Sequence, residues 1–310
     1  MGGGTWTSCA FRDYSKSVGR SVSESTGEVT THYAYATQAY TKTNLDPVMD
    51  PKVEKNRLRE CCDSEDHPSS IPIIMALDVT GSMGQTAIEV SKKLNTIIQG
   101  IADKLPDASF MVMGIGDLDY DEAPIQYSQF ESDIRIAQNL DSIYFEMGGG
   151  PNAYESYTAA WYVGARRTRC DCWKRGEKGL ILTIGDEILN PVLPIRQLSR
   201  AIGEDLDDSQ SLTVKTPDLY KEVSEKYDVG HIVVDHRGRG EYYYSQCSDS
   251  FSEVIGAQMV ATSTVPNISD TIVKFVLSWA DSRRSSPSAA TPKLKVETSG
   301  DGTMSVISWA

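Results

Sequence analysis

The sequence lacks the long apolar segments that place a protein in or across a membrane. No apolar run approaches the ~18 residues that a membrane-spanning helix needs. The polar start, MGGGTWTSCAFRDY, contains no apolar signal-peptide core. A myristoylation signal would need Ser or Thr at position six, where this chain has Trp6. We therefore expect a cytoplasmic protein that is not exported and does not associate with a membrane.

Basic residues are few in this chain. Its 310 residues include 30 Lys and Arg against 43 Asp and Glu, which gives a formal net charge of −13. Excess negative charge repels phosphate backbones, so nucleic acid is not an expected partner. The arginines and tyrosines at 237–244 are a weaker indication of single-stranded nucleic acid binding, and the overall acidity outweighs it.

Cysteines with the spacing of a zinc site are missing. Structural zinc sites usually pair cysteines separated by two to four residues, whereas the close pairs here are Cys61–Cys62 and Cys170–Cys172. A chain of this size needs no disulfides for stability, and nothing in the sequence indicates export. We expect reduced, mostly structural thiols.

Motifs of common hydrolases are also absent. The sequence contains neither a Gly-x-x-x-x-Gly-Lys-Ser/Thr phosphate loop nor a Gly-x-Ser-x-Gly elbow. Haloacid-dehalogenase-type phosphatases need a second Asp two residues after the nucleophilic one, but Thr80 follows Asp78 at that spacing. We therefore do not expect an enzyme, and a metal-dependent phosphoester hydrolase stays as the enzymatic alternative.

The sequence does contain short apolar runs of strand length. The four clearest lie at 71–79, 108–117, 179–186 and 231–235. Runs that are apolar on both faces are typical of buried parallel strands. Helical patterns separate them, and the predicted helices cover 85–105, 132–139, 155–167, 194–202, 217–227, 250–259 and 267–280. This alternation predicts an α/β fold with a doubly wound, mostly parallel, Rossmann-like sheet that carries helices on both faces. Residues 123–130 add a short edge strand, because Pro124 disfavours a central position.

The chain divides into three predicted regions. Residues 1–69 are a polar N-terminal arm, partly ordered, with weak strands at 29–40 and a short helix at 52–62. Residues 70–283 form the α/β domain. Residues 284–310 comprise a Ser/Pro-rich linker and a tail that can form a hairpin around Gly-Asp-Gly.

Three oxygen-bearing side chains follow the first apolar strand. Asp78, Thr80 and Ser82 are spaced i, i+2, i+4 through a Gly-containing turn, at the end of a strand where open parallel sheets bind ligands. Oxygen ligands suit hard cations such as Mg²⁺. Two of the three donors are neutral hydroxyls, so a bound ion stays electrophilic and can accept a carboxylate from a partner. The structural alternative is that Thr80 and Ser82 only cap the following helix.

The stretch Asp-Val-Thr-Gly-Ser-Met-Gly resembles the first motif, Asp-x-Ser/Thr-x-Ser, of the metal-ion-dependent adhesion site of von Willebrand factor A domains. Two later segments extend the resemblance in the family's order. GGGPNAYES (148–156) takes the place of the second ligand loop, and TIGDE (183–187) that of the third. The resemblance implies a site for Mg²⁺, or for Mn²⁺ or Ca²⁺, with the ligands Asp78, Thr80, Ser82, Asn152 and Asp186. The chain departs from the family at Asn152, where Thr or Asp is usual, and at Pro151, which can move the loop.

The resemblance also implies a function. A partner protein would place an Asp or Glu in the open coordination position, and the rim residues Met83, Asp119 and Tyr154 would set specificity. GIGDLDYDEAP (114–124) is similar to the family branch found beside atypical alpha-type kinases, and an intracellular bacterial or phage-like branch fits as well. Intracellular relatives imply a possible AAA+ ATPase system as partner. The alternative is a scaffold protein in which arm and tail make the contacts and the metal only stabilises the fold.

Overall fold

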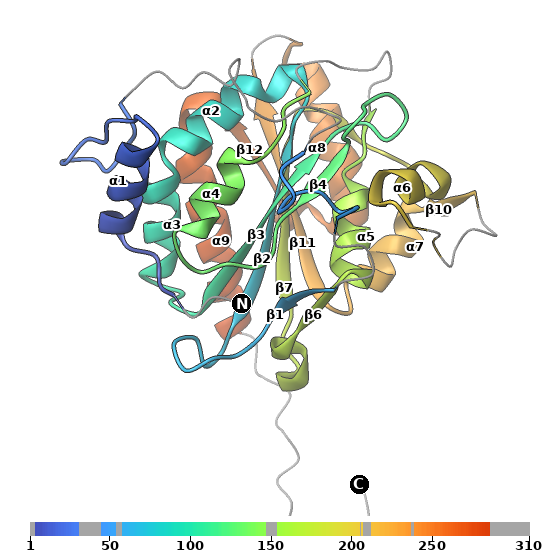
Figure 1. The fold of residues 1–310 in the computed structure, drawn as a ribbon. Coiled ribbons are helices and arrows are strands. Elements are labelled where there is room, and N and C mark those ends of the chain that lie inside the picture. The colour runs from blue at the N-terminus through green and yellow to red at the C-terminus, as the bar shows by residue number, and fades with distance from the viewer. Residues whose placement is uncertain are drawn as a thin grey trace, which may run out of the picture.

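A six-stranded sheet forms the centre of the molecule (Figure 1). The computed structural model describes residues 4–30, 45–53, 58–146, 154–204, 206, 212–236 and 239–285. In spatial order the strands are β12 (Val260–Thr264), β11 (Tyr227–Asp235), β7 (Gly179–Gly185), β2 (Ile71–Asp78), β3 (Ala108–Ile115) and β4 (Ile125–Tyr127). All neighbours are parallel except β3 and β4. The predicted mostly parallel sheet and its short edge strand are thus confirmed.

The order of the strands creates a switch point in the sheet. If the six strands are numbered along the chain, their spatial order is 3-2-1-4-5-6, as in dinucleotide-binding folds. The chain winds outward in one direction from β2 and in the opposite direction from β7. These two strands are neighbours, with Leu77 in register with Ile184. Ligands of open α/β sheets bind beyond the carboxyl ends of such a strand pair, so the fold itself marks the space after β2 and β7.

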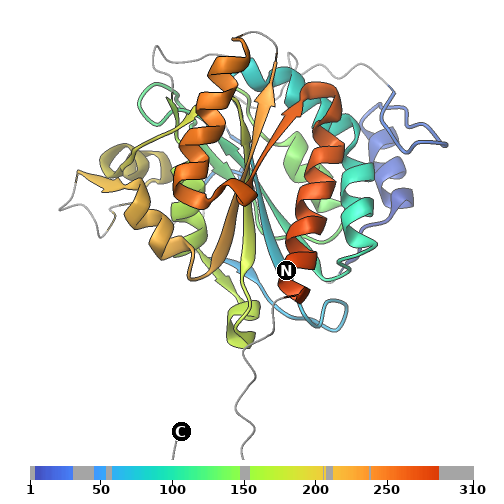
Figure 2. The ribbon, with the colours of Figure 1, turned by 180° about the vertical axis from the view of Figure 1, so that it is seen from behind.

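Helices cover both faces of the sheet (Figures 1 and 2). One face carries α2 (Gly84–Lys92), α3 (Leu94–Ala102), α4 (Arg135–Asp141) and α9 (Ile268–Ser285). The other face carries α5 (Thr158–Arg166), α6 (Ile195–Ile202), α7 (Thr216–Val223) and α8 (Glu241–Ile255). No described helix is long and apolar enough to cross a membrane.

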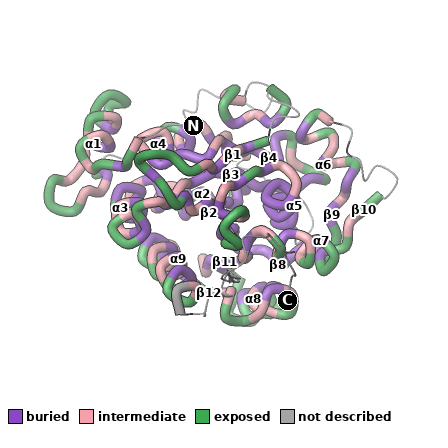
Figure 3. The backbone as a smooth tube through the Cα atoms, turned by 90° about the horizontal axis from the view of Figure 1, so that it is seen from below, coloured by how far each residue is buried: buried purple, intermediate pink, exposed green. Residues whose placement is uncertain are grey.

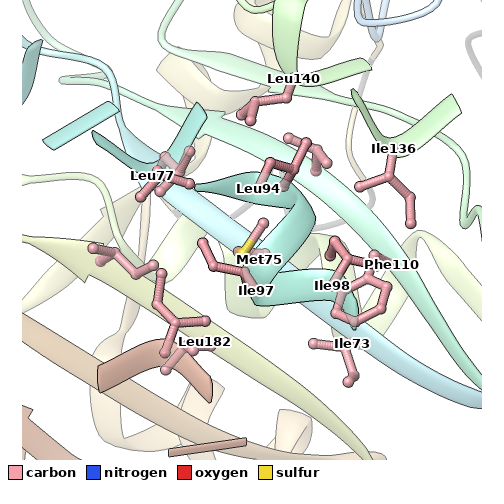
Figure 4. Packing of buried hydrophobic residues seen from close by; sticks show 14 of the residues in the cluster. Ile73, Met75, Leu77, Leu94, Ile97, Ile98, Phe110, Ile136, Leu140 and Leu182 are labelled. Atoms are coloured by element: carbon pink, nitrogen blue, oxygen red, sulfur yellow. The ribbon is translucent and has the colours of Figure 1, made fainter. Parts of the chain in front are cut away.

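Alternate residues of each central strand pack into the hydrophobic cores on opposite faces of the sheet. In β2, Ile73, Met75 and Leu77 pack with α2, α3, α4 and α9, as Figure 4 shows for their contacts with Ile97 and Ile98 of α3. Ile74 and Ala76 point to the opposite face and pack with α5. The strand is therefore buried on both sides, as the burial of the chain in Figure 3 also indicates, and its continuous apolar sequence follows from this position.

Helix α5 lies unusually close to the sheet. A Cβ at Gly164 would approach Cδ1 of Ile181 to 2.5 Å, so only glycine allows this packing distance. Eight of its nine residues are buried. The helix predicted from small residues is thus confirmed, although it begins at Thr158 rather than Glu155.

Several element boundaries differ from the predictions. The helix predicted over 85–105 is divided at Lys93, whose φ of −100° and ψ of 10° leave helical geometry; both halves contact α9. The helix predicted to end at Tyr227 stops at Val223, because Tyr227 already pairs with Gly179 as the first residue of β11. The predicted helix 250–259 is the end of the longer α8, and the edge strand β12 follows it.

The described parts of the predicted arm pack on the domain. Helix α1 (Ser8–Ser17) was not expected; Thr7 caps it by accepting the backbone N–H of Ala10. Trp6 and Phe11 join the core on the α3 side. The predicted helix 52–62 is wrong at its end, because strand β1 (Arg59–Cys61) pairs there with β6 (Thr168–Cys170). The predicted hairpin tail and residues 31–40 of the weak strands lie outside the described residues.

The remaining described elements are short. The small strands are β5 (Tyr154–Glu155), β8 (Ile188–Leu189), β9 (Val192–Pro194) and β10 (Thr213–Lys215). The short 3₁₀ helices are η2 (Gly81–Met83), η3 (Asp171–Arg175), η5 (Ala257–Met259) and η6 (Val265–Asn267). Of these, β5, β8 and η2 flank the carboxyl ends of β2 and β7.

Candidate metal centre

The carboxylate of Asp78 folds the turn that follows β2. Its Oδ1 accepts the backbone N–H of Thr80 at 2.9 Å and the Thr80 hydroxyl at 2.6 Å. The turn then continues into η2 and α2 without a side-chain cap on either helix. Thr80 and Ser82 thus do not act as helix caps, and their hydroxyls are turned toward the carboxylates instead.

Asp186 meets this turn from the neighbouring strand. It directly follows β7, and its Oδ1 accepts the hydroxyl of Ser82 at 3.0 Å. The hydroxyl oxygens of Thr80 and Ser82 are 3.5 Å apart. The structure therefore brings together Asp78, Thr80, Ser82 and Asp186, four of the five predicted ligands, from segments about a hundred residues apart. The fifth, Asn152, lies outside the described residues.

A residue that the sequence did not point to completes the contacts of Asp78. Tyr157, at the start of α5, donates its hydroxyl to Asp78 Oδ2 at 2.9 Å. The hydroxyl oxygen of Tyr157 in turn accepts the backbone N–H of Glu187 at 3.3 Å. The one signal in the sequence is Gly185, because a Cβ there would lie 1.9 Å from the tyrosine hydroxyl oxygen.

The site concentrates negative charge in a buried place. Asp78 and Asp186 are both almost fully buried. Burial, and then the neighbouring Asp186 carboxylate, raise the pKa of Asp78 to about 7. Burial, followed by the charge of Asp78, raises the pKa of Glu155 to about 11. Ionised carboxylates are thus unfavourable here without a cation, and Glu155 is protonated at neutral pH.

Basic side chains approach the site without neutralising Asp78. His236 follows β11, and its Nε2 lies 3.8 Å from Asp186 Oδ2 and 3.3 Å from the sulfur of Met83. Burial lowers the pKa of His236, so the imidazole is neutral at neutral pH. The guanidinium of Arg239 is paired with Glu187.

The predicted rim residues fall into two groups. Tyr154 is 41% exposed in β5, and Asp119 is exposed in the loop after β3, where it accepts a hydrogen bond of 2.7 Å from Gln197. Met83 is only 1% exposed. It packs into the core beside Ala87 and Val90 of α2, so its expected place on an accessible rim is not what the structure shows.

The sequence matches no protein-family model and no curated protein. Similar solved structures include the pilus adhesin SpaC from Lactobacillus rhamnosus GG, at 12% identity and a TM-score of 0.45 over 71% of this chain and 30% of that chain. Another is the vWF domain of the type V pili tip protein Mfa5 from Porphyromonas gingivalis, at 10% identity and 0.45 over 69% and 96%. An aerotolerance-related membrane protein from Bacteroides fragilis follows at 14% and 0.38 over 67% and 100%. This chain spans less than a third of the length of SpaC.

The donor set fits a hard divalent cation. The hydroxyl protons of Thr80 and Ser82 are used on carboxylates, so the lone pairs of both oxygens stay available to an ion. Two carboxylates supply the charge, and all four donors are oxygen, as Mg²⁺ prefers. Among the described residues, no group of three or more His, Cys, Asp or Glu side chains is placed to hold a metal ion.

Other features noted in the sequence do not form sites. The acidic turn after β3 closes on itself, because Asp117 Oδ1 accepts the N–H of Asp119 and Asp121 Oδ2 accepts the N–H of Asp117. The six cysteines have free thiols. A cavity of about 400 Å³ lies between β12 and α9, lined in part by Phe275 and Trp279, and is separate from the candidate metal centre.

Proposed function

We propose that this chain is a von Willebrand factor A-type domain that binds a partner protein through a divalent metal ion. Asp78, Thr80, Ser82 and Asp186 would hold Mg²⁺, or Mn²⁺ or Ca²⁺ in its place. The observation that carries the proposal is the hydrogen bond from Ser82 to Asp186, since it joins the first and third motifs of the resemblance at the switch point of the sheet.

The bound ion would supply a positive centre at the carboxyl edge of the sheet. Two of its four protein donors are neutral hydroxyls, so the ion would keep affinity for a further anionic oxygen. An Asp or Glu carboxylate of a partner is the natural ligand for such a position. The exposed Tyr154 of β5 and Asp119 of the loop after β3 would contact that partner. An AAA+ ATPase system is one class of partner that fits this proposal.

The charge of the site supports a bound cation. Burial and the Asp186 carboxylate raise the pKa of Asp78 to about 7, and a cation would offset both effects by stabilising the ionised form. Enzymatic use of the ion would require a general base beside it. Tyr157 is a poor base, because burial raises its pKa well above the ordinary value and its hydroxyl donates to Asp78.

Titration calorimetry with Mg²⁺ and Mn²⁺ tests the metal site directly. We expect binding by the full chain and loss of binding in Asp186→Ala. Asp107→Ala is the matched control, because it removes the same charge at the opposite end of the strands, beside Ile71. Equal binding by Asp186→Ala and wild type contradicts the proposed site.

The open coordination position needs a second measurement. Manganese bound to the protein relaxes the protons of its remaining water ligands, and we expect acetate, as a carboxylate probe, to reduce this relaxation in a saturable way. A short peptide with one Asp should do so at lower concentration than its Asn counterpart. If manganese binds but neither probe affects the relaxation, the ion only stabilises the fold, as in the scaffold alternative.

A further inference from the structure

The hydroxyl of Tyr157 is the meeting point of three chain segments. It donates to Asp78 at the end of β2, accepts the N–H of Glu187 after β7, and belongs to the start of α5. Asp186, the second charged donor of the proposed metal centre, precedes Glu187 directly. One buried hydroxyl thus sets the position of one carboxylate and of the backbone that carries the other.

The residues packed around the Tyr157 ring allow it only one position. Tyr157 is fully buried, and Gly185 provides the space for its hydroxyl, since a Cβ would lie 1.9 Å from that oxygen. On the other side, His231 and Phe251 contact the ring edge-on, with centroid distances of 5.2 and 5.5 Å. His231 is itself held by a 2.8 Å hydrogen bond to Thr183 of β7. A ring packed in this way cannot move aside without disturbing the core.

The hydroxyl also determines which oxygen of Asp78 remains available. Asp78 Oδ1 already accepts two hydrogen bonds from Thr80. Oδ2 accepts one from Tyr157, which leaves it one lone pair. The rotamer of Asp78 is therefore constrained at both oxygens, and its free lone pair has a defined direction.

We propose that Tyr157 is a positioning residue of the metal centre: it holds Asp78 and the Asp186–Glu187 backbone in the relative placement that the ion requires. This inference rests on the proposed metal-binding function. Tyr157 would act through Asp78 and the Glu187 backbone rather than as a ligand, and it would lower the cost of bringing two buried carboxylates together by organising them before the ion arrives. Its loss should weaken metal binding more than it weakens the fold.

The chain contains a matched control for this inference. Tyr227 is also fully buried, donates its hydroxyl to Thr168 at 2.8 Å, and lies against a glycine, Gly179, whose Cβ would meet the ring at 2.5 Å. It stands at the start of β11, at the end of the sheet opposite the metal centre. Tyr157→Phe and Tyr227→Phe each remove one buried, hydrogen-bonded hydroxyl from equivalent surroundings.

The experiment compares Mg²⁺ affinity by calorimetry and thermal unfolding in chelator for the full chain and both variants. We expect comparable decreases in unfolding temperature, with Mg²⁺ affinity reduced about tenfold in Tyr157→Phe, or ~1.4 kcal/mol, and changed less than twofold in Tyr227→Phe. The magnesium-induced rise in unfolding temperature should shrink only in Tyr157→Phe.

Three results would overturn the inference in distinguishable ways. Equal losses of affinity in both variants would show that Tyr157 acts only through general stability. Unchanged affinity in Tyr157→Phe, with binding still lost in Asp186→Ala, would refute the positioning role and leave the metal site intact. Absence of Mg²⁺ and Mn²⁺ binding by the wild type would refute the metal site itself, and this inference with it.

Discussion

Replacing Asp78 by asparagine should separate the stability of the fold from its proposed function. Asparagine keeps the shape of the side chain, and its carbonyl oxygen can accept both hydrogen bonds from Thr80. On the other side, an amide group replaces the oxygen that Tyr157 donates to, so the tyrosine hydroxyl has to rotate and accept instead. The substitution removes one buried negative charge and one of the two charged donors of the proposed metal centre.

The magnitude follows from the burial of Asp78. Its pKa is about 7 in the folded protein against an ordinary 3.8, because burial and Asp186 disfavour the ionised form. At ~1.36 kcal/mol per pH unit, ionisation at pH 8 destabilises the metal-free fold by up to ~4 kcal/mol. We expect Asp78→Asn to recover about half of this, ~2 kcal/mol, because the rotated Tyr157 hydroxyl makes a weaker contact. For a domain of this size that is a rise of ~5 °C in unfolding temperature.

Thermal unfolding at pH 8 in the presence of chelator measures the gain, and calorimetry with Mg²⁺ measures the loss of binding. Asp107→Asn is the control, since that carboxylate is partly exposed at the opposite end of the sheet. The reasoning is refuted if Asp78→Asn unfolds at a lower temperature than wild type in chelator. It is equally refuted if the variant binds Mg²⁺ as tightly as wild type does.

Three further predictions concern the same region. A carboxyl whose pKa is raised on folding destabilises the fold as pH rises from ~4 to its folded value. Metal-free wild type should therefore unfold at a lower temperature at pH 8 than at pH 5.5. Saturating Mg²⁺ or Asp78→Asn should make this dependence shallower without removing it, because burial also raises the pKa of Glu155. Gly185→Ala should lower the free energy of unfolding by about 1–3 kcal/mol and abolish Mg²⁺ binding, because the new Cβ overlaps the Tyr157 hydroxyl. Denaturant unfolding and calorimetry measure the two effects, and tight Mg²⁺ binding by a stably folded variant would contradict this prediction. Arg239→Ala should cost about 1–3 kcal/mol in denaturant unfolding, because Arg239 is partly exposed but its removal leaves the nearly buried Glu187 carboxylate without this cation; an unchanged free energy of unfolding would contradict this.

The central sheet could be predicted from the sequence because its strands are buried on both faces. Runs such as 71–79 and 179–186 are mostly apolar, and an apolar run of this length is more often a buried strand than a helix. The positions of Asp78 and Asp186 then followed from topology, because parallel strands end at one edge of the sheet. Their direct connection through Ser82 needed the structure, since it depends on β2 and β7 being neighbours.

Elements at the periphery gave weaker patterns. In α8 the buried residues are Tyr244, Cys247, Phe251 and Ile255, a helical spacing, but tyrosine and cysteine do not mark a core face as clearly as leucine does. Strand β12, Val-Ala-Thr-Ser-Thr, is β-branched but hardly apolar, as suits an edge strand. Strand β1 is stabilised by pairing with a segment more than a hundred residues away, so the local charge pattern predicted a helix where tertiary pairing produces a strand.

Tyr157 shows why a site is harder to predict than the fold that carries it. The metal motifs are local, and each can be matched to a pattern of a few residues. The role proposed for Tyr157 depends on the packing of α5 against the sheet at Gly164 and on the space that Gly185 leaves for the hydroxyl. Gly164 lies in none of these motifs, and Gly185, although it stands in the third motif segment beside Asp186, does not indicate which side chain fills the space next to it. A glycine directly before an aspartate at the end of a buried strand, as Gly185 stands before Asp186, is therefore a reason to look for a side chain that fills the space beside it.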